Sequence, residues 1–311
     1  MASTPTIQQA PQPEVSTLTG TPLLQADSAG DSVFLAFDSI SNSSEAQWTA
    51  ATPNDFTTFS ANESVTDVAI SAGGTMFATN VNGTASAGTL AGTLTGPPLG
   101  SIVEIRDSAL NLIGNRATPE LEQLPTGITV PGIAMHPSGA LVYQPILNGP
   151  APAESANPIP NPNLRGGIDI FDLRSGKLRL RIFLPEPIAA RSADTNSLLA
   201  QFVTIDETGQ RIFAITNSGL TVIQLANVPL GIGTISPANA PAAGGTTITV
   251  RGSNFQTGTT ATLAGKNATV TLIDANTLVL VTPATSPGPQ RLTLTNPDTE
   301  TVSLDAALTA N

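Results

Sequence analysis

Short alternating runs of apolar and polar residues, bounded by Gly or Pro, constrain the fold of this chain most strongly. In residues 246–251, Ile248 and Val250 alternate with threonines, which is the period-two pattern of a half-buried strand. Gly244 and Gly245 come just before this run and allow turn conformations that a Cβ would obstruct. The sequence therefore predicts a turn followed by a strand at this point.

The rest of the C-terminal part repeats this pattern. Further alternating runs occupy residues 259–263, 268–273, 276–281, 291–296 and 301–308. About six or seven short strands in roughly eighty residues are typical of an Ig-like β-sandwich. The chain contains no Cys, so this sandwich is predicted to form without a disulfide.

Several motifs of this part occur in a recognisable order. They are Ile-x-Pro, Gly-Gly-Thr, Ile-Thr-Val-x-Gly-x-Asn-Phe ending at Phe255, Thr282-Pro283, and Leu-Thr-Leu-Thr-Asn-Pro-Asp ending at Asp298. Together they resemble the IPT/TIG domain, an Ig-like fold of bacterial surface proteins, cell-surface receptors and some transcription factors. Many members have Gly after the last motif, where this chain has Thr299. The resemblance implies a structural or adhesive module in residues 230–311, with Gly244, Gly245 and Phe255 in structural roles.

A second pattern, Gly-x-x-x-aromatic, recurs in the preceding part of the chain. Each copy follows an apolar alternating run and polar turn residues, and the aromatic residues are Phe34, Phe77, Tyr143 and Phe213. A repeat of about 40 residues with insertions indicates the blades of a β-propeller. We expect these four aromatic residues to be buried between blades, because propeller blades pack face to face.

Each repeat can be divided into antiparallel strands of one blade. The expected strands are residues 23–26, 32–38, 46–51 and 56–60; 65–70, 76–80, 101–107 and 112–116; 130–135, 141–146, 167–172 and 178–184; and 199–205, 211–216 and 220–225. The run from Ile168 to Leu178, Ile-Asp-Ile-Phe-Asp-Leu-Arg-Ser-Gly-Lys-Leu, resembles bacterial YVTN-type, lactonase-like propeller repeats. Residues 22–229 are therefore predicted to form a small or partial propeller of about four blades, and the whole chain to be all-β.

The fourth predicted blade lacks an outer strand. Residues 1–21 are a lead-in, but residues 14–19 within it form an extended Thr/Ser-rich run with Val15 and Leu18. We predict that this run pairs with the strand carrying Leu220 and Val222. It would do so within the chain, closing the ring, or between chains, producing an oligomer or a filament.

The composition limits the partners. A net charge of −11 and a pI near 4.4 disfavour nucleic acid and anionic lipid, so protein partners, self-association and carbohydrate remain. No apolar run is long enough for a membrane span, and no leader is present, so an exported form would have lost one.

Few residues suggest chemistry. His136 is the only histidine, and its place in His-Pro-Ser-Gly indicates a turn residue. The sequence predicts no cofactor, although a composite calcium site from distant loops stays open. Lys177, Arg179 and Arg181 are expected on the exposed face of an outer strand, where cations prevent edge pairing; the alternative is a patch for an acidic partner.

These observations favour a non-enzymatic structural or adhesion protein, extracellular or at the cell surface, that assembles through strand exchange. The alternative is a propeller enzyme of the lactonase or quinoprotein-like type. It would need carboxylates such as Asp67 or Asp206 at a central channel.

Overall fold

The computed structural model describes eight strands of the N-terminal part by their backbone, in residues 21–26, 32–38, 43–49, 56–61, 65–70, 76–81, 102–107 and 112–117. It then describes residues 133–148, 165–175, 177–186, 188 and 203–311. Every regular element in these residues is a β-strand, which confirms the all-β prediction.

The first two sheets are antiparallel and have four strands each, in sequence order. Blade 1 contains β1 (Thr21–Ala26), β2 (Ser32–Asp38), β3 (Ser43–Thr49) and β4 (Phe56–Ala61). Blade 2 contains β5 (Val65–Ile70), β6 (Met76–Val81), β7 (Ile102–Asp107) and β8 (Leu112–Ala117).

The next two sheets continue this arrangement. Blade 3 contains β9 (Ala134–Met135), β10 (Leu141–Asn148), β11 (Arg165–Asp172) and β12 (Leu178–Phe183). Blade 4 contains three described strands, β13 (Val203–Ile205), β14 (Arg211–Thr216) and β15 (Gly219–Gln224). Four consecutive antiparallel sheets of this kind form a propeller-like segment.

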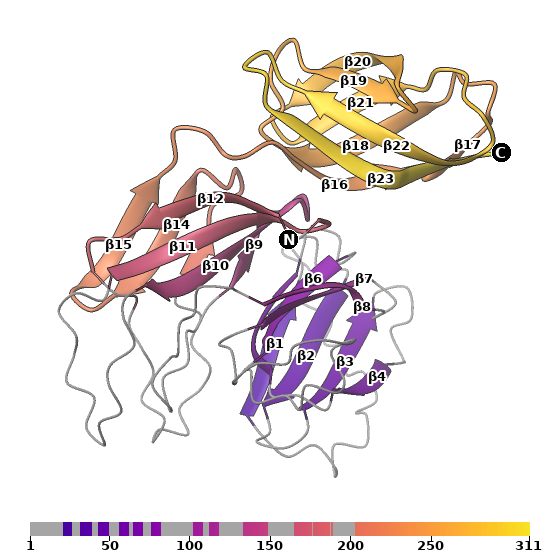
Figure 1. The fold of residues 1–311 in the computed structure, drawn as a ribbon. Helices are drawn as coiled ribbons and strands as arrows, with labels where there is room; N and C mark the ends of the chain where they lie inside the picture. The colour runs from indigo at the N-terminus through magenta and orange to yellow at the C-terminus, as the bar shows by residue number, and fades with distance from the viewer. Residues whose placement is uncertain are drawn as a thin grey trace, which may run out of the picture.

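The first strands of successive blades lie side by side, since β5 contacts β1 and β9, and β9 contacts β13. Blade 4 and blade 1 do not meet at the end of this series. Figure 1 shows β15 on one side of the molecule and β1 to β4 on the other. The four blades therefore form an open arc.

Blades 3 and 4 pack face to face around a shared apolar core. Ile168, Ile170 and Leu141 of blade 3 are fully buried against Val203 and Ile212 of blade 4. The opposite face of blade 3 has its own small cluster, which includes Val142 and Phe171 in neighbouring strands. Both faces of blade 3 are thus apolar, as expected of a blade with a neighbour on each side.

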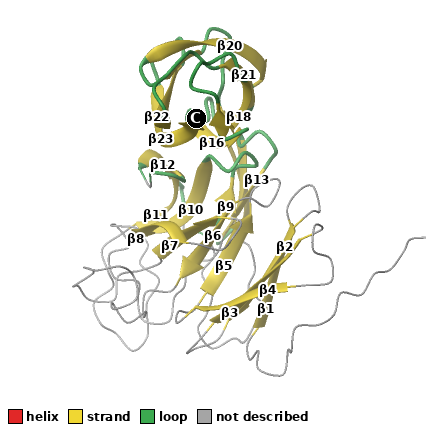
Figure 2. Cartoon of the chain, turned by 90° about the vertical axis from the view of Figure 1, so that its right-hand side faces the viewer, coloured by secondary structure: helices red, strands yellow, loops and turns green. Residues whose placement is uncertain are grey.

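The C-terminal part forms an Ig-like sandwich above the blades (Figures 1 and 2). Its strands are β16 (Gly231–Ser236), β17 (Asn239–Ala240), β18 (Thr247–Ser253), β19 (Thr260–Leu263), β20 (Lys266–Asp274), β21 (Thr277–Val281), β22 (Gly288–Thr295) and β23 (Thr301–Ala310). The long strand β20 pairs with β19 at its start and with β21 further on, so it takes part in both sheets of the sandwich.

The observed strands lie within a few residues of most predicted ones. The main difference is at the start of the sandwich, where β16 and β17 add two strands that the sequence did not predict. Gly231 and Gly233 interrupt the apolar alternation of β16, which hides its strand character. In blade 3, β9 occupies the last two residues of the run expected at 130–135, of which residues 130–132 lie outside the described residues.

Candidate assembly edge and interdomain junction

A buried histidine holds blades 3 and 4 together. The Nδ1 atom of His136 lies 2.8 Å from the Ser138 hydroxyl and accepts a hydrogen bond from the Ser138 backbone N–H. Its Nε2 atom is 3.2 Å from the carbonyl oxygen of Thr208, in the turn between β13 and β14. Because a carbonyl only accepts, Nε2 carries the proton of the neutral ring. His136 is therefore a turn residue, as predicted, and also a bond between blades.

Tyr143 completes this contact. Its side chain is fully buried, and its hydroxyl donates to the carbonyl oxygen of Gly209 at 3.1 Å. A Cβ on Gly209 would lie 2.5 Å from His136 Cδ2 and 2.6 Å from the Tyr143 hydroxyl oxygen. The repeat's glycine is thus required at this close approach, in addition to its positive φ of 68°.

Burial sets the acid–base behaviour of both side chains. Desolvation lowers the pKa of His136 to about 4, and hydrogen bonding to Thr208 and the charge of Asp206 oppose the shift only partly. Desolvation also raises the pKa of Tyr143 far above its ordinary value. Both groups stay neutral at neutral pH, as suits a core contact.

Asp206 is occupied within its own turn. Desolvation alone raises the pKa of this carboxyl, but hydrogen bonds from Arg211 N–H, the Thr208 hydroxyl and Gln210 N–H outweigh it and give a net lowering. Asp67, the other carboxylate considered for catalysis, lies in β5, and its side chain is outside the described residues. In the part of the chain that the structure describes, no three acidic, His or Cys side chains gather as a metal site would require. The described residues contain no helix that is long and apolar enough to cross a membrane.

The Ig-like domain is packed directly against the turn of blade 3. A Cβ on Gly233 would lie 2.0 Å from the carbonyl oxygen of Ser138, so only glycine permits this approach of β16. Val228, before β16, is buried with the residues of blades 3 and 4, whereas Leu230 is buried in the core of the Ig-like domain. The connection between the domains is therefore part of two cores.

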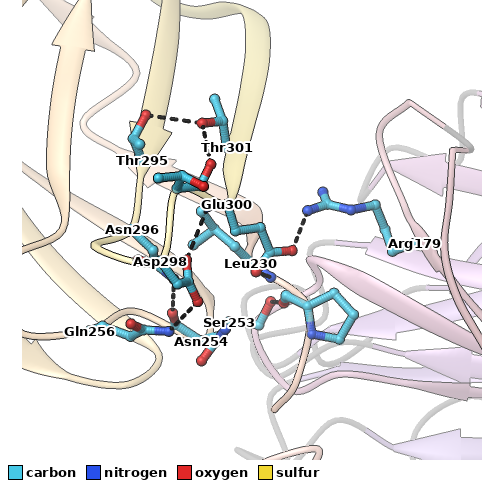
Figure 3. Close-up of polar contacts among 12 residues, drawn as sticks. Arg179, Leu230, Ser253, Asn254, Gln256, Thr295, Asn296, Asp298, Glu300 and Thr301 are labelled. Carbon is cyan, nitrogen blue, oxygen red and sulfur yellow. Dashed lines mark hydrogen bonds and ion pairs between the residues drawn. The ribbon is translucent and has the colours of Figure 1, made fainter.

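An ion pair reinforces this junction (Figure 3). Nη2 of Arg179 lies 2.6 Å from Oε1 of Glu300, and the other carboxylate oxygen of Glu300 accepts the N–H of Leu230 at 3.1 Å. The Arg179 side chain is 11% exposed. Nearby, the hydroxyl of Ser253 donates to the carbonyl oxygen of Pro229 at 2.7 Å. Glu300, which lies between β22 and β23, thus connects Arg179 of blade 3 with Leu230 at the start of the Ig-like domain.

Lys177, Arg179 and Arg181 were predicted to lie on an exposed face, and this is wrong for two of the three. Arg179 is the extra residue of a β-bulge, because Ile170 pairs with Leu180 while Phe171 pairs with Leu178. The bulge redirects Arg179 towards the Ig-like domain. Arg181 forms a two-pronged ion pair at 2.7 Å with Asp169, which is 1% exposed. Lys177 alone is exposed.

The outer edge of blade 4 has no strand paired to it among the described strands, where the sheet order is β13-β14-β15. Leu225 N–H donates to the carbonyl oxygen of Gln210, on the β14 side. Because successive N–H groups of a strand alternate in direction, those of Leu220, Val222 and Gln224 point to the free edge.

The outer face of blade 4 is apolar as well as exposed. Leu220 is 62% exposed, Val222 55% and Ile215 39%. Leu220 pairs with Ile215, and Val222 pairs with the half-buried Phe213. Call these four residues the blade 4 patch. Exposed apolar side chains in one cluster mark an interaction site more often than single ones do.

The other predicted site residues are distributed as follows. Gly244 and Gly245 both have positive φ, and Phe255 is buried in the sandwich core. The side chains of Phe34 and Phe77 lie outside the described residues, as do Val15, Leu18 and the whole run 14–19. Tyr143 is buried between blades as predicted, whereas the prediction is wrong for Phe213 within one chain. Phe213 is only half-buried, because it lies on the outer face of blade 4, away from blade 3.

Sequence reasoning did not identify Glu300, Gly233 or the contact of Arg179 with the Ig-like domain as parts of the junction. Nothing in the local sequence separates Glu300 from any other carboxylate, because its partner is 121 positions away. The Gly-Ile-Gly run at 231–233 was the available signal, since paired glycines inside an apolar stretch indicate a close backbone approach.

Solved structures similar to the chain include Kuenenia stuttgartiensis hydrazine synthase, with 13% identity, 65% of this chain and 52% of that chain covered, and a TM-score of 0.44. They also include the Dos1 propeller, with 12% identity, 93% of this chain and 68% of that chain covered, and a TM-score of 0.35. For the WD40 domain of Toxoplasma gondii coronin the identity is 11%, the match covers 81% of this chain and 54% of that chain, and the TM-score is 0.35. The chain spans about half the length of the hydrazine synthase chain.

No curated protein is significantly similar to this chain. The family described as IPT/TIG domain matches residues 230–310. That range begins at Leu230, the first residue of the sandwich core, and includes all the strands β16 to β23. Residues 230–310 are an IPT/TIG domain of Ig-like fold, which follows a propeller-like segment of four blades.

Proposed function

We propose that this protein is a non-enzymatic structural or adhesion protein that assembles with other copies of itself through the free edge of β15. The observation that carries the proposal is the coincidence at β15 of outward N–H groups and exposed apolar side chains, Leu220 and Val222. Exposed apolar edge strands pair readily with another strand, and soluble proteins normally protect them.

The strand that pairs with β15 is proposed to be residues 14–19 of a neighbouring copy. These residues directly precede β1, and a chain of seven residues spans at most about 25 Å. Because blade 1 and β15 lie on opposite sides of the molecule in Figure 1, a second copy is the better source of this strand than the same chain. In such an exchange, each molecule donates one strand, residues 14–19, and accepts one strand at β15.

The IPT/TIG domain supports a structural role. The Arg179–Glu300 pair, the close approach at Gly233 and the buried connection hold this domain in a fixed place on blades 3 and 4. Assembly of the propeller-like segments would therefore present the domains in a regular arrangement. We propose an extracellular or cell-surface location, with protein or carbohydrate as the external partner, because the net charge of −11 disfavours nucleic acid.

The proposal is tested by the particle mass and by one proline substitution. Light scattering after size exclusion should give a mass above the 31.6 kDa of one chain. Gln224→Pro places a ring where an outward N–H now points, which blocks strand addition without removing a backbone hydrogen bond to β14. It also removes the side-chain acceptor of Arg211 Nε. This variant should be monomeric, with an unchanged far-UV circular dichroism spectrum.

Gln224→Ala is the matched control, since it loses the same side chain but keeps the N–H, and it should assemble like the natural chain. A monomeric natural chain at micromolar concentration would refute the proposal. So would assembly of Gln224→Pro at full strength.

A further inference from the structure

We infer that the blade 4 patch is a blade-to-blade interface that receives blade 1 of a second copy, so that two copies close one ring. This inference rests on the proposed function and adds to it the packing surface and the number of copies. The patch comprises Phe213, Ile215, Leu220 and Val222.

The first argument is the contrast between the two faces of blade 4. Its inner face places Val203, Ile212 and Ala214 against blade 3, and all three are fully buried. Its outer face carries side chains of the same type, yet Leu220 and Val222 are more than half exposed. A sheet that is apolar on both faces is normally covered on both. The outer face thus has the composition of a blade interface but no described blade against it.

The second argument identifies the occupant. Strand β2 of blade 1 contains five successive apolar residues, Val-Phe-Leu-Ala-Phe, at positions 33–37. Because successive residues of a strand belong to opposite faces, the sequence of this run assigns apolar residue types to both faces of β2. Blade 2 lies against blade 1 through β5, which accounts for one of them. By this pattern, the second face of β2 is an apolar partner for the exposed blade 4 patch of the next copy.

The third argument sets the number of copies. A contact between two different surfaces generates a closed ring or an open filament, depending on the rotation that relates the copies. Propellers typically have four to eight blades. Two copies with four blades each give eight blades, whereas three copies exceed this range. The same partner would supply residues 14–19 beside β15, because they directly precede its β1.

The experiment combines particle mass, particle shape and a paired substitution. The natural chain should have twice the mass of the 31.6 kDa chain at all concentrations above its Kd, and negative-stain images should show rings with one central channel. The double variant Leu220→Asp, Val222→Asp places two charges in the interface. It should raise the Kd by about 100-fold or more, measured by sedimentation. Both side chains are exposed in one copy, so the folded spectrum should not change.

Ile273→Asp is the matched control, because Ile273 is 58% exposed on the IPT/TIG domain, away from the patch. It should leave the two-copy particle intact. Filaments, or rings of more than two copies, would overturn this inference but leave strand exchange standing. A monomeric natural chain would overturn both. Equal weakening by Ile273→Asp and by the double variant would show that the patch is not the interface.

Discussion

At the scale of single residues, His136 links the turn of blade 3 to that of blade 4, and its burial makes the protein sensitive to acid. The unfolded chain binds a proton at this residue near its ordinary pKa of 6.5, whereas the folded chain does so only near 4. Between these values the unfolded state binds more protons, so the free energy of unfolding falls as the pH falls. At pH 5 the loss should be about 2 kcal/mol relative to pH 7.5.

Urea unfolding at the two pH values checks this expectation. The chain has a single histidine, so His136→Gln isolates its contribution. This variant should be less stable at pH 7.5, because the bonds to Ser138 and Thr208 change, but it should lose little further stability by pH 5. An equal loss in the variant and the natural chain would assign the acid sensitivity to carboxylates such as Asp206.

The sequence predicted part of this contact. The Pro-Ser-Gly turn after His136 is a local signal, and it indicated the turn correctly. The partner, the Thr208 carbonyl oxygen, is 72 positions away and offers a backbone group that every residue has. Contacts of this kind have no local signature, so the link between blades became visible only in three dimensions.

At the scale of elements, alternation and turn residues were sufficient to place most strands, because the period of two follows directly from the pleated backbone. They failed where a single residue changes the register. The bulge at Arg179 places one extra residue in β12, and one residue is enough to exchange the two faces of a strand. Arg179 and Arg181 consequently find carboxylate partners, instead of lying on the exposed face that simple alternation predicted.

The bulge gives a testable consequence at the junction. Glu300→Gln keeps the shape of the side chain but removes its charge, which leaves the largely buried Arg179 without a charged partner. We expect the free energy of unfolding to fall by about 1–3 kcal/mol, the range for a charged hydrogen bond lost in a mostly buried place. Denaturant unfolding measures this value.

Asp305→Asn provides the comparison, since Asp305 pairs with Arg291 where both side chains are mainly exposed. Exposed pairs contribute little, so this variant should be nearly as stable as the natural chain. A Glu300→Gln effect no larger than that of Asp305→Asn would show that the junction ion pair does not stabilise the docked domain.

At the scale of the whole molecule, the two domains share a connection that belongs to both cores. Val228 packs with blades 3 and 4, and two residues later Leu230 packs inside the IPT/TIG domain. A flexible linker would have allowed the domains to move independently. The short buried connection instead couples the position of the IPT/TIG domain to the orientation of the last blade. Any closure at the blade 4 patch would therefore fix the domain's place in the assembly.

The same connection predicts where the chain can be divided. The sandwich core lies entirely within residues 230–308, so residues 230–311 expressed alone should fold. Starting at residue 234 removes Leu230 and Ile232, which are at most 1% exposed, and half of β16. Burying two aliphatic side chains contributes roughly 3–6 kcal/mol. A domain of this size has only about 4–12 kcal/mol in total.

The shorter fragment should therefore be marginally stable or unfolded, and urea titrations followed by far-UV circular dichroism would measure the difference. Circular dichroism is needed because the only Trp and Tyr, Trp48 and Tyr143, precede the domain. A longer fragment that starts at residue 227 should match the 230–311 fragment, since Val228 packs against blades that are missing from both. Equal midpoints for the fragments starting at 230 and 234 would contradict the inclusion of Leu230 and Ile232 in the core. A gain in stability from residues 227–229 would place the boundary earlier in the chain.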